Sequence, residues 1–172
     1  MSHRPIPRRL LLSLIMGMSL AACGGESDEA LLKKAQQSIE AGDRKAALIQ
    51  LKSAVQEDEN NAEARFHLGK LQLELGDFAS AEKELRRARQ AGHDADSVNP
   101  LLARALIGQG EYKRVLDDLP APESGSRAEV PMLVMRATAQ LGAGDKDEAR
   151  RSLDRALAAA PKDTEVLLAQ AR

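Results

Sequence analysis

The side chains that could carry out chemistry are few and scattered along this chain of 172 residues. Beyond the N-terminal segment the only histidines are His67 and His93, and neither has a second histidine four residues away, as a helical zinc site would need. Ser124 and Ser126 lie in a stretch of loop-forming residues with no base nearby in the sequence. We interpret both histidines as surface or boundary residues and expect no nucleophile, no metal and no cofactor.

Acidic pairs and glycine pairs are the other patterns that could indicate a site. The pairs Asp117–Asp118 and Asp94/Asp96 have no apolar, enclosed stretch around them, so solvated carboxylates are a better interpretation than an acid–base pair. Two Gly-x-Gly strings occur at 108–110 and 142–144. A phosphate-binding loop would follow a strand, whereas these strings follow expected helices, so they predict helix ends. The sequence does not indicate an enzyme or a small-molecule substrate.

The N-terminal segment, 1–22, has the organisation of an export signal. Three arginines and no acid precede an apolar run from Leu10 to Ala22, which at about 13 residues is too short to span a bilayer. The run ends in Leu20-Ala21-Ala22-Cys23, which resembles the lipobox of bacterial lipoproteins, and Cys23 is the only cysteine. The resemblance implies that residues 1–22 are a signal peptide and that Cys23 is lipidated as the first mature residue. The alternative is a plain secretory signal with an incidental cysteine.

Removal of residues 1–22 would leave an acidic chain. The full chain has 25 basic and 26 acidic residues and the signal contains three of the basic ones, so 23–172 has 22 against 26 and a net charge of −4. A negative net charge disfavours nucleic acid as a partner and disfavours a polybasic contact with the membrane. We therefore expect the protein to attach to the membrane through acyl chains. Residues 23–27 would form a short tether. Gly24 rather than aspartate follows the cysteine, which by the enterobacterial sorting rule favours the outer membrane, facing the periplasm of a Gram-negative bacterium.

A period of about 34 residues organises the rest of the chain. Glycines recur at this step, and columns of small residues and leucines keep it. The columns are Gly42, Gly76, Gly110 and Gly144; Ala35, Gly69, Ala103 and Ala137; Ala47, Ala81, Val115 and Ala149; Leu51, Leu85, Leu119 and Leu153; and Ala54, Ala88 and Ala156. The pattern resembles the tetratricopeptide repeat, a helix–turn–helix unit. Small side chains let two antiparallel helices approach, and each glycine accepts the left-handed conformation that ends the first helix.

The columns predict an all-α, right-handed solenoid of about four tetratricopeptide repeats. We expect repeats at 28–61, 62–95, 96–129 and 130–163, and the start of a fifth at 164–172. In three turns an aspartate follows the glycine and should cap the second helix: Asp43, Asp77 and Asp145. Glu111 takes this place in the third repeat, which weakens that turn, and Glu148 should form a capping-box-like pair with Asp145.

The third repeat is degenerate. Asn99 followed by Pro100 gives a helix-start signal, a cap and then a first-turn proline. Pro120 and Pro122 should stop the second helix near Leu119 and leave an exposed loop over 120–129.

The last residues predict a further helix that begins at Thr164. Its Leu and Val side chains would be half covered, because a solenoid repeat buries its apolar face only against its neighbours. We therefore expect a truncated, N-terminal part of a longer array. The alternative is that 164–172 is a short capping helix.

The first helices of such arrays line a concave surface that holds peptides. The chaperone-type carboxylate clamp is absent, because Leu32 and Gln36 stand at its first two positions. An apolar stripe with charges beside it is typical of a helix-in-groove or extended-peptide site. For Leu32, Phe66 and Leu73 the alternative is packing of one repeat on the next. The candidate groove residues are Leu32, Gln36, Ile39, Phe66, Lys70, Leu73, Arg104, Ile107, Val134 and Leu141, with Glu40, Glu74 and Thr138 beside them.

From residue 20 to about 119 the sequence resembles the PEP-CTERM system tetratricopeptide-repeat lipoprotein, the PrsT family. The stretches that carry the likeness are Ile49-Gln50-Leu51-Lys52, Ala64-Arg65-Phe66, Leu68-Gly69-Lys70, Ala81-Glu82-Lys83-Glu84-Leu85 and Pro100-Leu101-Leu102-Ala103-Arg104. Members of this family are long arrays associated with exosortase and exopolysaccharide clusters. The resemblance implies a scaffold for protein–protein interactions in that export and assembly system, with no catalytic residues to carry over.

Two rival functions remain open from the sequence. One is a secretin- or outer-membrane-barrel-assembly tetratricopeptide lipoprotein, which would be short and complete. The other is the non-catalytic arm of a longer enzyme, which would have a different composition after Arg172.

Overall fold

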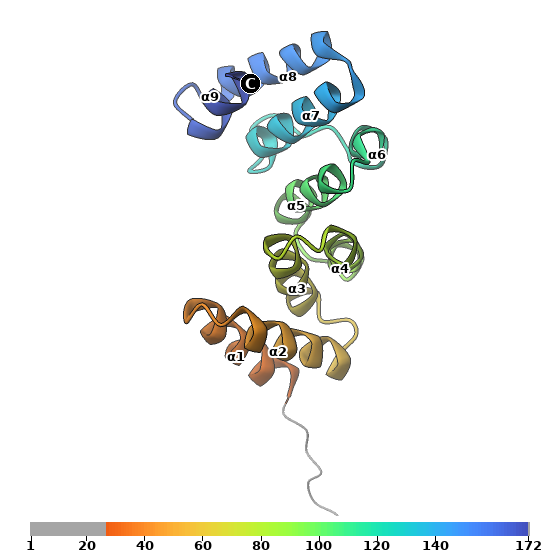
Figure 1. Ribbon diagram of the computed structural model, residues 1–172, viewed down its shortest axis with the longest axis vertical. Helices are drawn as coiled ribbons and strands as arrows, with labels where there is room; N and C mark the ends of the chain where they lie inside the picture. The colour runs from red at the N-terminus through yellow and green to blue at the C-terminus, as the bar shows by residue number, and fades with distance from the viewer. Residues whose placement is uncertain (1–26, 172) are drawn as a thin grey trace, which may run out of the picture.

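The computed structural model describes residues 27–171, and this part of the chain is built from helices joined by short turns (Figure 1). The proposed signal peptide, Cys23 and most of the tether lie outside the described residues. The helices are α1 (Asp28–Glu40), α2 (Arg44–Glu57), α3 (Ala62–Glu74), α4 (Phe78–Gln90), α5 (Ala95–Gly108), α6 (Tyr112–Asp118), α7 (Glu129–Ala143), α8 (Lys146–Ala159) and α9 (Thr164–Gln170).

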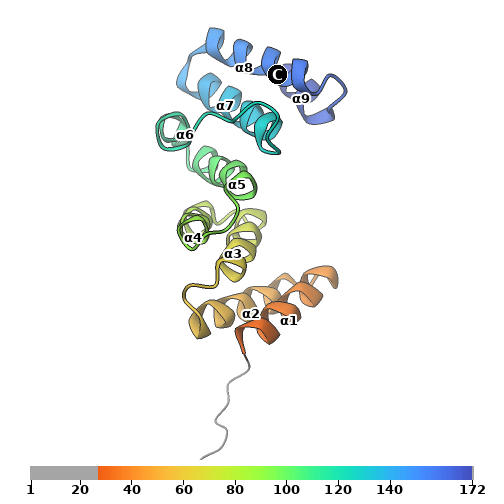
Figure 2. The same cartoon turned by 180° about the vertical axis from the view of Figure 1, so that it is seen from behind.

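The helices pack mainly in consecutive pairs, α1 with α2, α3 with α4 and α7 with α8. The first pair contacts the second through α2 and α3, and α5 and α6 connect the second pair to α7. As a result α3, α5 and α7 follow one another along one side of an elongated array, and α4 and α6 lie along the other (Figures 1 and 2). The expected all-α repeat architecture is confirmed.

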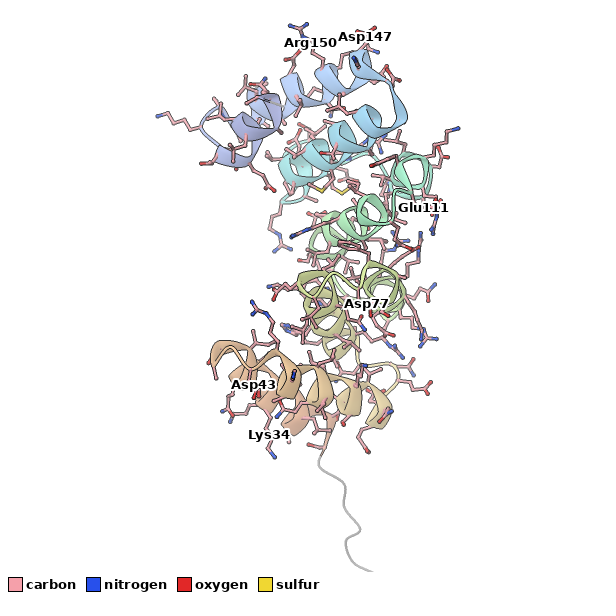
Figure 3. All side chains as sticks on the ribbon, in the orientation of Figure 1. Lys34, Asp43, Asp77, Glu111, Asp147 and Arg150 are labelled. Carbon is pink, nitrogen blue, oxygen red and sulfur yellow. The ribbon has the colours of Figure 1, made fainter. Side chains whose placement is uncertain are left out.

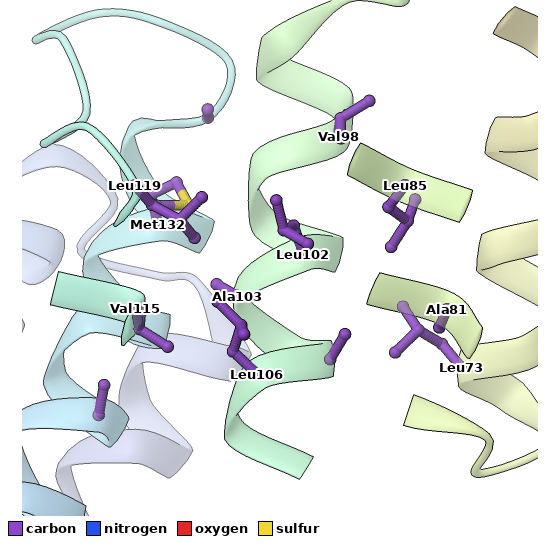
Figure 4. Packing of buried hydrophobic residues seen from close by; sticks show 13 residues of the cluster. Leu73, Ala81, Leu85, Val98, Leu102, Ala103, Leu106, Val115, Leu119 and Met132 are labelled. Carbon is purple, nitrogen blue, oxygen red and sulfur yellow. The ribbon is translucent and has the colours of Figure 1, made fainter. Parts of the chain in front are cut away.

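The columns of small residues lie where helices meet. Ala35, Ala47, Ala81 and Ala103 are completely buried. Gly69 lies against α4 so closely that a Cβ atom there would be 2.7 Å from Leu85 Cγ. The largest cluster runs through the middle of the array, where residues of α3 and α4 pack on α5, and α5 packs on α6 and α7 (Figure 4). The close approach of the backbones thus follows from the small side chains, as the sequence predicts.

The turns after the first helices have the expected chemistry. Gly42, Gly76, Gly110 and Gly144 have φ angles of 76°, 79°, 78° and 89°. Asp43 and Asp77 accept backbone hydrogen bonds at 3.0 and 3.2 Å at the starts of α2 and α4, whereas Glu111 makes no side-chain cap on α6 (Figure 3).

The capping box at α8 is only half formed. Asp145 accepts from the Glu148 N–H at 3.2 Å, but the Glu148 carboxylate pairs with Arg151 rather than reaching back to the cap. The nearby arginine offers this carboxylate a charged partner, so the expected reciprocal bond is wrong.

The predicted helix start at Asn99 and Pro100 is also wrong. α5 begins five residues earlier, at Ala95 rather than Pro100, because Asp94 caps it by accepting from the Ser97 N–H at 3.0 Å. Pro100 lies in the second turn, where it cannot donate to the carbonyl four residues before it. Asn99 is buried and accepts a hydrogen bond from Arg89 at 3.0 Å, so it ties α5 to α4 instead of capping a helix.

The ends of the third and fourth repeats follow the sequence more closely. α6 stops at Asp118, before the two prolines, and the connection runs to Ala128, since α7 already begins at Glu129. α9 begins at Thr164 with Asp163 as its cap. In α9 Val166 is fully buried, while Leu167 and Leu168 are 47% and 58% exposed.

Candidate functional site

The structure separates the ten candidate groove residues into three groups: buried, partly buried and exposed. Leu73 and Val134 are 5% and 4% exposed and belong to hydrophobic clusters, so their side chains pack helix on helix rather than face a groove. Leu32, Phe66 and Ile107 are partly buried against the same kind of cluster. The exposed members are Gln36, Ile39, Lys70, Arg104 and Leu141.

An open pocket of about 160 Å³ lies between α1 and α3. Its apolar lining residues are Ile39 and Leu71, and Lys70 adds a cation to the lining. Its lining residues are Gln36, Ile39, Glu40, His67, Lys70, Leu71 and Glu74. Helical spacing explains the grouping, because residues three or four apart on one helix share a face. The pocket therefore unites three of the ten predicted residues, Gln36, Ile39 and Lys70, and both glutamates placed beside them.

The position of this pocket follows from how the repeats are joined. At the joint between the second and third pairs, the ring of Phe78 lies flat against Gly108, where a Cβ atom would come within 2.6 Å of it. At the next joint Tyr112 lies against Gly142 in the same way. The sequence predicts only helix ends at these glycines, and the structure adds that they are contact surfaces for aromatic rings.

The first joint carries a different pair at the same register. Arg44 and Glu74 stand one repeat before Phe78 and Gly108, and Arg44 Nε lies 3.9 Å from Glu74 Oε2. Both side chains are exposed, at 61% and 41%. A weak, solvated ion pair thus replaces a packed ring at the joint that has the pocket.

His67 and Leu71 are the two pocket residues that the sequence did not predict, and His67 is the polar one. Its Nε2 lies 2.9 Å from Glu63 Oε1, and Nε2 of His93 lies 3.2 Å from Glu63 Oε2, so one carboxylate bridges two histidines. The His93 ring stacks on Phe66 with centroids 4.1 Å apart. The available signal was spacing, because His67 lies three residues before Lys70 and so shares its helix face.

Two groups of ion pairs connect neighbouring helices, one between α3 and α4 and one between α4 and α6. Arg65 and Glu84 form a buried pair at 2.5 Å, and Arg65 Nε also donates to the Glu59 carbonyl at 2.7 Å. On α4 and α6, Arg86 and Arg114 both pair with Glu82 and Asp118. The carboxylate of Asp118 therefore has two arginine partners, Arg86 and Arg114, and its role there is structural.

The pKa of the Glu82 carboxyl reflects this second group of ion pairs. Burial by itself raises the pKa, but hydrogen bonds from Gln109, Arg86 and Arg114 outweigh burial and lower the pKa below its ordinary value. The carboxylate therefore stays ionised and serves to hold α4 against α5 and α6.

The described residues offer no arrangement for metal chemistry or membrane crossing. Within 27–171, no three His, Cys, Asp or Glu side chains are grouped so that they could hold a metal ion. No helix in that range is both long and apolar enough to pass through a bilayer.

The acidic residue Asp94 also has a structural role. It caps α5 and pairs with Arg127 at 2.8 Å, which explains this acid without acid–base chemistry.

Comparison with known proteins agrees with this architecture. Residues 38–105 match one tetratricopeptide-repeat model and residues 130–172 match another. No curated protein sequence matches the chain. Among solved structures, a double mutant of MamA RS-1 is 18% identical with a TM-score of 0.72, over 83% of this chain and 80% of that one.

Two further structures show the same likeness. A tetratricopeptide repeat protein from Parabacteroides merdae ATCC 43184 is 20% identical with a TM-score of 0.63, over 86% of this chain and 59% of its own. YrrB, described as a tetratricopeptide-repeat protein with an unusual peptide-binding site, is 14% identical with a TM-score of 0.54, over 85% and 93%. At these identities the likeness concerns the fold. This chain is an all-α tetratricopeptide-repeat protein, a class that generally serves as a scaffold for protein–protein interaction.

Proposed function

We propose that this protein is a lipid-anchored scaffold that holds a protein or peptide partner in the pocket between α1 and α3. The observation that carries the proposal is the pocket itself, since a lining that combines apolar and charged side chains suits a peptide. The peptide-binding site named for YrrB is consistent with such a use of the fold. The proposed activity is binding without catalysis.

The proposed setting is the periplasmic side of the outer membrane in a Gram-negative bacterium, within the export and assembly of exopolysaccharide or PEP-CTERM proteins. Support comes from the lipobox-like Leu20-Ala21-Ala22-Cys23 and from the likeness to PrsT-type lipoproteins. Acylation of Cys23 would give firm membrane attachment, because several acyl chains anchor a protein where one is marginal. The scaffold would then present its pocket close to the membrane.

The anchor is tested by Cys23→Ser. The variant should leave the membrane fraction or remain unprocessed with its signal attached, as membrane fractionation and intact mass would show. A variant that is still cleaved and still membrane-bound would contradict the lipobox interpretation.

The pocket and the pathway are tested together by complementation of a gene deletion. Ile39→Glu places a charge in the apolar part of the pocket lining and should abolish exopolysaccharide export, or surface display of PEP-CTERM proteins, at an unchanged protein level. Ile49→Glu is the matched control, because Ile49 is 67% exposed on α2 and does not line the pocket. Normal export with reduced secretin or barrel assembly would favour the rival function instead.

A further inference from the structure

The acidic residues of α1, α3, α5 and α7 are confined to the ends of these helices. Each lies in the first two residues or at the last residue of its helix. They are Asp28, Glu29, Glu40, Glu63, Glu74, Asp96 and Glu129. The middle of this helix row therefore carries no carboxylate, although residues 23–172 as a whole have a net charge of −4.

Cations occupy this middle line in the second and third repeats. Gln36, Lys70 and Arg104 stand at one register of successive repeats, on α1, α3 and α5, and the last two are cations. Gln36 and Lys70 both line the pocket, so this register faces it, and Arg104 continues the same line onto the next helix. Lys70 and Arg104 are exposed, and neither forms an ion pair with another described residue.

The nearby acids form no ion pair with these two cations. Glu74 lies 3.9 Å from Arg44, and Glu63 lies between His67 and His93. Glu40 and Glu74 are the last residues of α1 and α3 and line the same end of the pocket, whereas the cationic register runs from Lys70 away from α1 to Arg104. Two unpaired cations on adjacent, contacting helices therefore remain available to a ligand.

We propose that the partner is an extended peptide with acidic side chains about three residues apart, held across α3 and α5 by Lys70 and Arg104. The inference rests on the proposed function and adds the chemistry of the partner. The spacing follows from geometry, because packed helices have axes about 8–10 Å apart and an extended chain advances about 3.3–3.6 Å per residue. An apolar residue of the peptide on the α1 side of the acid held by Lys70 would lie over the pocket, against Ile39 and Leu71.

The test is fluorescence anisotropy with three labelled peptides and the purified full chain in detergent. The peptides repeat Ser-Leu-Asp, Ser-Leu-Asn or Ser-Leu-Lys three times. The aspartate peptide should bind most tightly, and its affinity should fall as salt is added. Lys70→Glu with Arg104→Glu should weaken it by about ten-fold, because each change replaces an attraction with a repulsion.

The matched control is Lys113→Glu with Arg150→Glu, which makes the same charge change at exposed positions of α6 and α8. Arg150 lies far from the pocket, at the opposite end of the array (Figure 3). The control should bind the aspartate peptide like the unchanged protein, and circular dichroism should show equal helix content in both variants.

Equal loss of affinity in the two double variants would overturn the inference, since net charge alone would then explain it. Equal binding of the aspartate and asparagine peptides would also overturn it while leaving the peptide-binding scaffold intact. Binding of none of the three peptides would contradict both the acidic partner and the proposed function.

Discussion

Gly108 and Gly142 each lack the one atom that would keep an aromatic ring away from the helix backbone. Rings of Phe78 and Tyr112 occupy the space that a Cβ would need, at about the same distance in both cases. A glycine inside a helix is normally unfavourable by about 1 kcal/mol relative to alanine. Here the cost is offset by the packing of a large ring, so the two residues act as one unit.

A double-mutant cycle tests this unit. Gly108→Ala should destabilise the protein by about 1 kcal/mol, because overpacking against Phe78 outweighs the gain in helix propensity. In the Phe78→Ala background the same change should stabilise, since the ring is gone. Urea unfolding of the four proteins measures the coupling. Additive effects would show that Gly108 and Phe78 do not depend on each other.

Glu82 provides a pH prediction at the same scale. Its folded-state pKa is lowered, so the ionised carboxylate stabilises the fold; this contribution is complete above the ordinary value of 4.5 and is lost as the pH falls through the lowered value. Glu82→Gln should therefore lower the free energy of unfolding by about 1–2 kcal/mol at neutral pH, and by progressively less as the pH falls below 4.5 through the lowered pKa. A difference that stays constant across this range would contradict the ionic role.

At the scale of elements, α6 is the weakest second helix. It spans Tyr112–Asp118, has no side-chain cap and ends at prolines, whereas α2, α4 and α8 have capping aspartates and run for 13 or 14 residues. Packing of Val115 and Leu119 into the main cluster holds it in place. The missing N-cap at Glu111 is thus one identifiable cause of the lower expected stability of α6.

Glu111→Asp should strengthen this element. Aspartate at the N-cap can accept from the N–H three residues on, as Asp43 and Asp77 do, and such caps contribute about 0.5–2 kcal/mol. We expect slower amide exchange in α6 and a higher free energy of unfolding. Asp77→Ala, which removes a formed cap, should shift stability in the opposite direction, and no change in either variant would argue against the capping geometry.

At the scale of the whole molecule, the joints between repeats are unequal. At the second and third joints an aromatic side chain packs on a glycine. The first joint instead has the exposed ion pair between Arg44 and Glu74, and the pocket lies there. The core at the first joint is a separate cluster, in which Ala35, Ala47 and Leu51 pack with Leu68 and Leu71 of α3. We infer that the first joint is the loosest of the three ring-bearing or ion-paired joints, because it has no aromatic ring packed on a glycine.

Transfer of the ring–glycine pair tests this inference. Arg44→Phe with Glu74→Gly should give the first joint the contact found at the other two, and hydrogen exchange in α1 and α2 should slow. The same variant should alter peptide binding, because Glu74 lines the pocket. Unchanged exchange would show that the joint is already as tight as the others.

The candidate site was only partly visible in the sequence. The repeat register identified Gln36, Ile39 and Lys70 because helical spacing places them on one face. The repeat register could not show that Leu73 and Val134 are buried while these three residues are exposed, because the exposure of a side chain depends on which neighbouring helix covers it.

By itself the sequence determined the helix pairs, their turns and their close packing, because these depend on local chemistry that recurs in each repeat: glycine for a positive φ, aspartate for a cap and alanine for a near contact. Three features were decided only by the tertiary structure. Asn99 connects α5 to α4 instead of capping a helix, and the ring of Phe78 packs on Gly108. The third feature is the pocket lined in part by His67. Each of these depends on residues that belong to different helices, and such contacts exist only once the repeats are stacked.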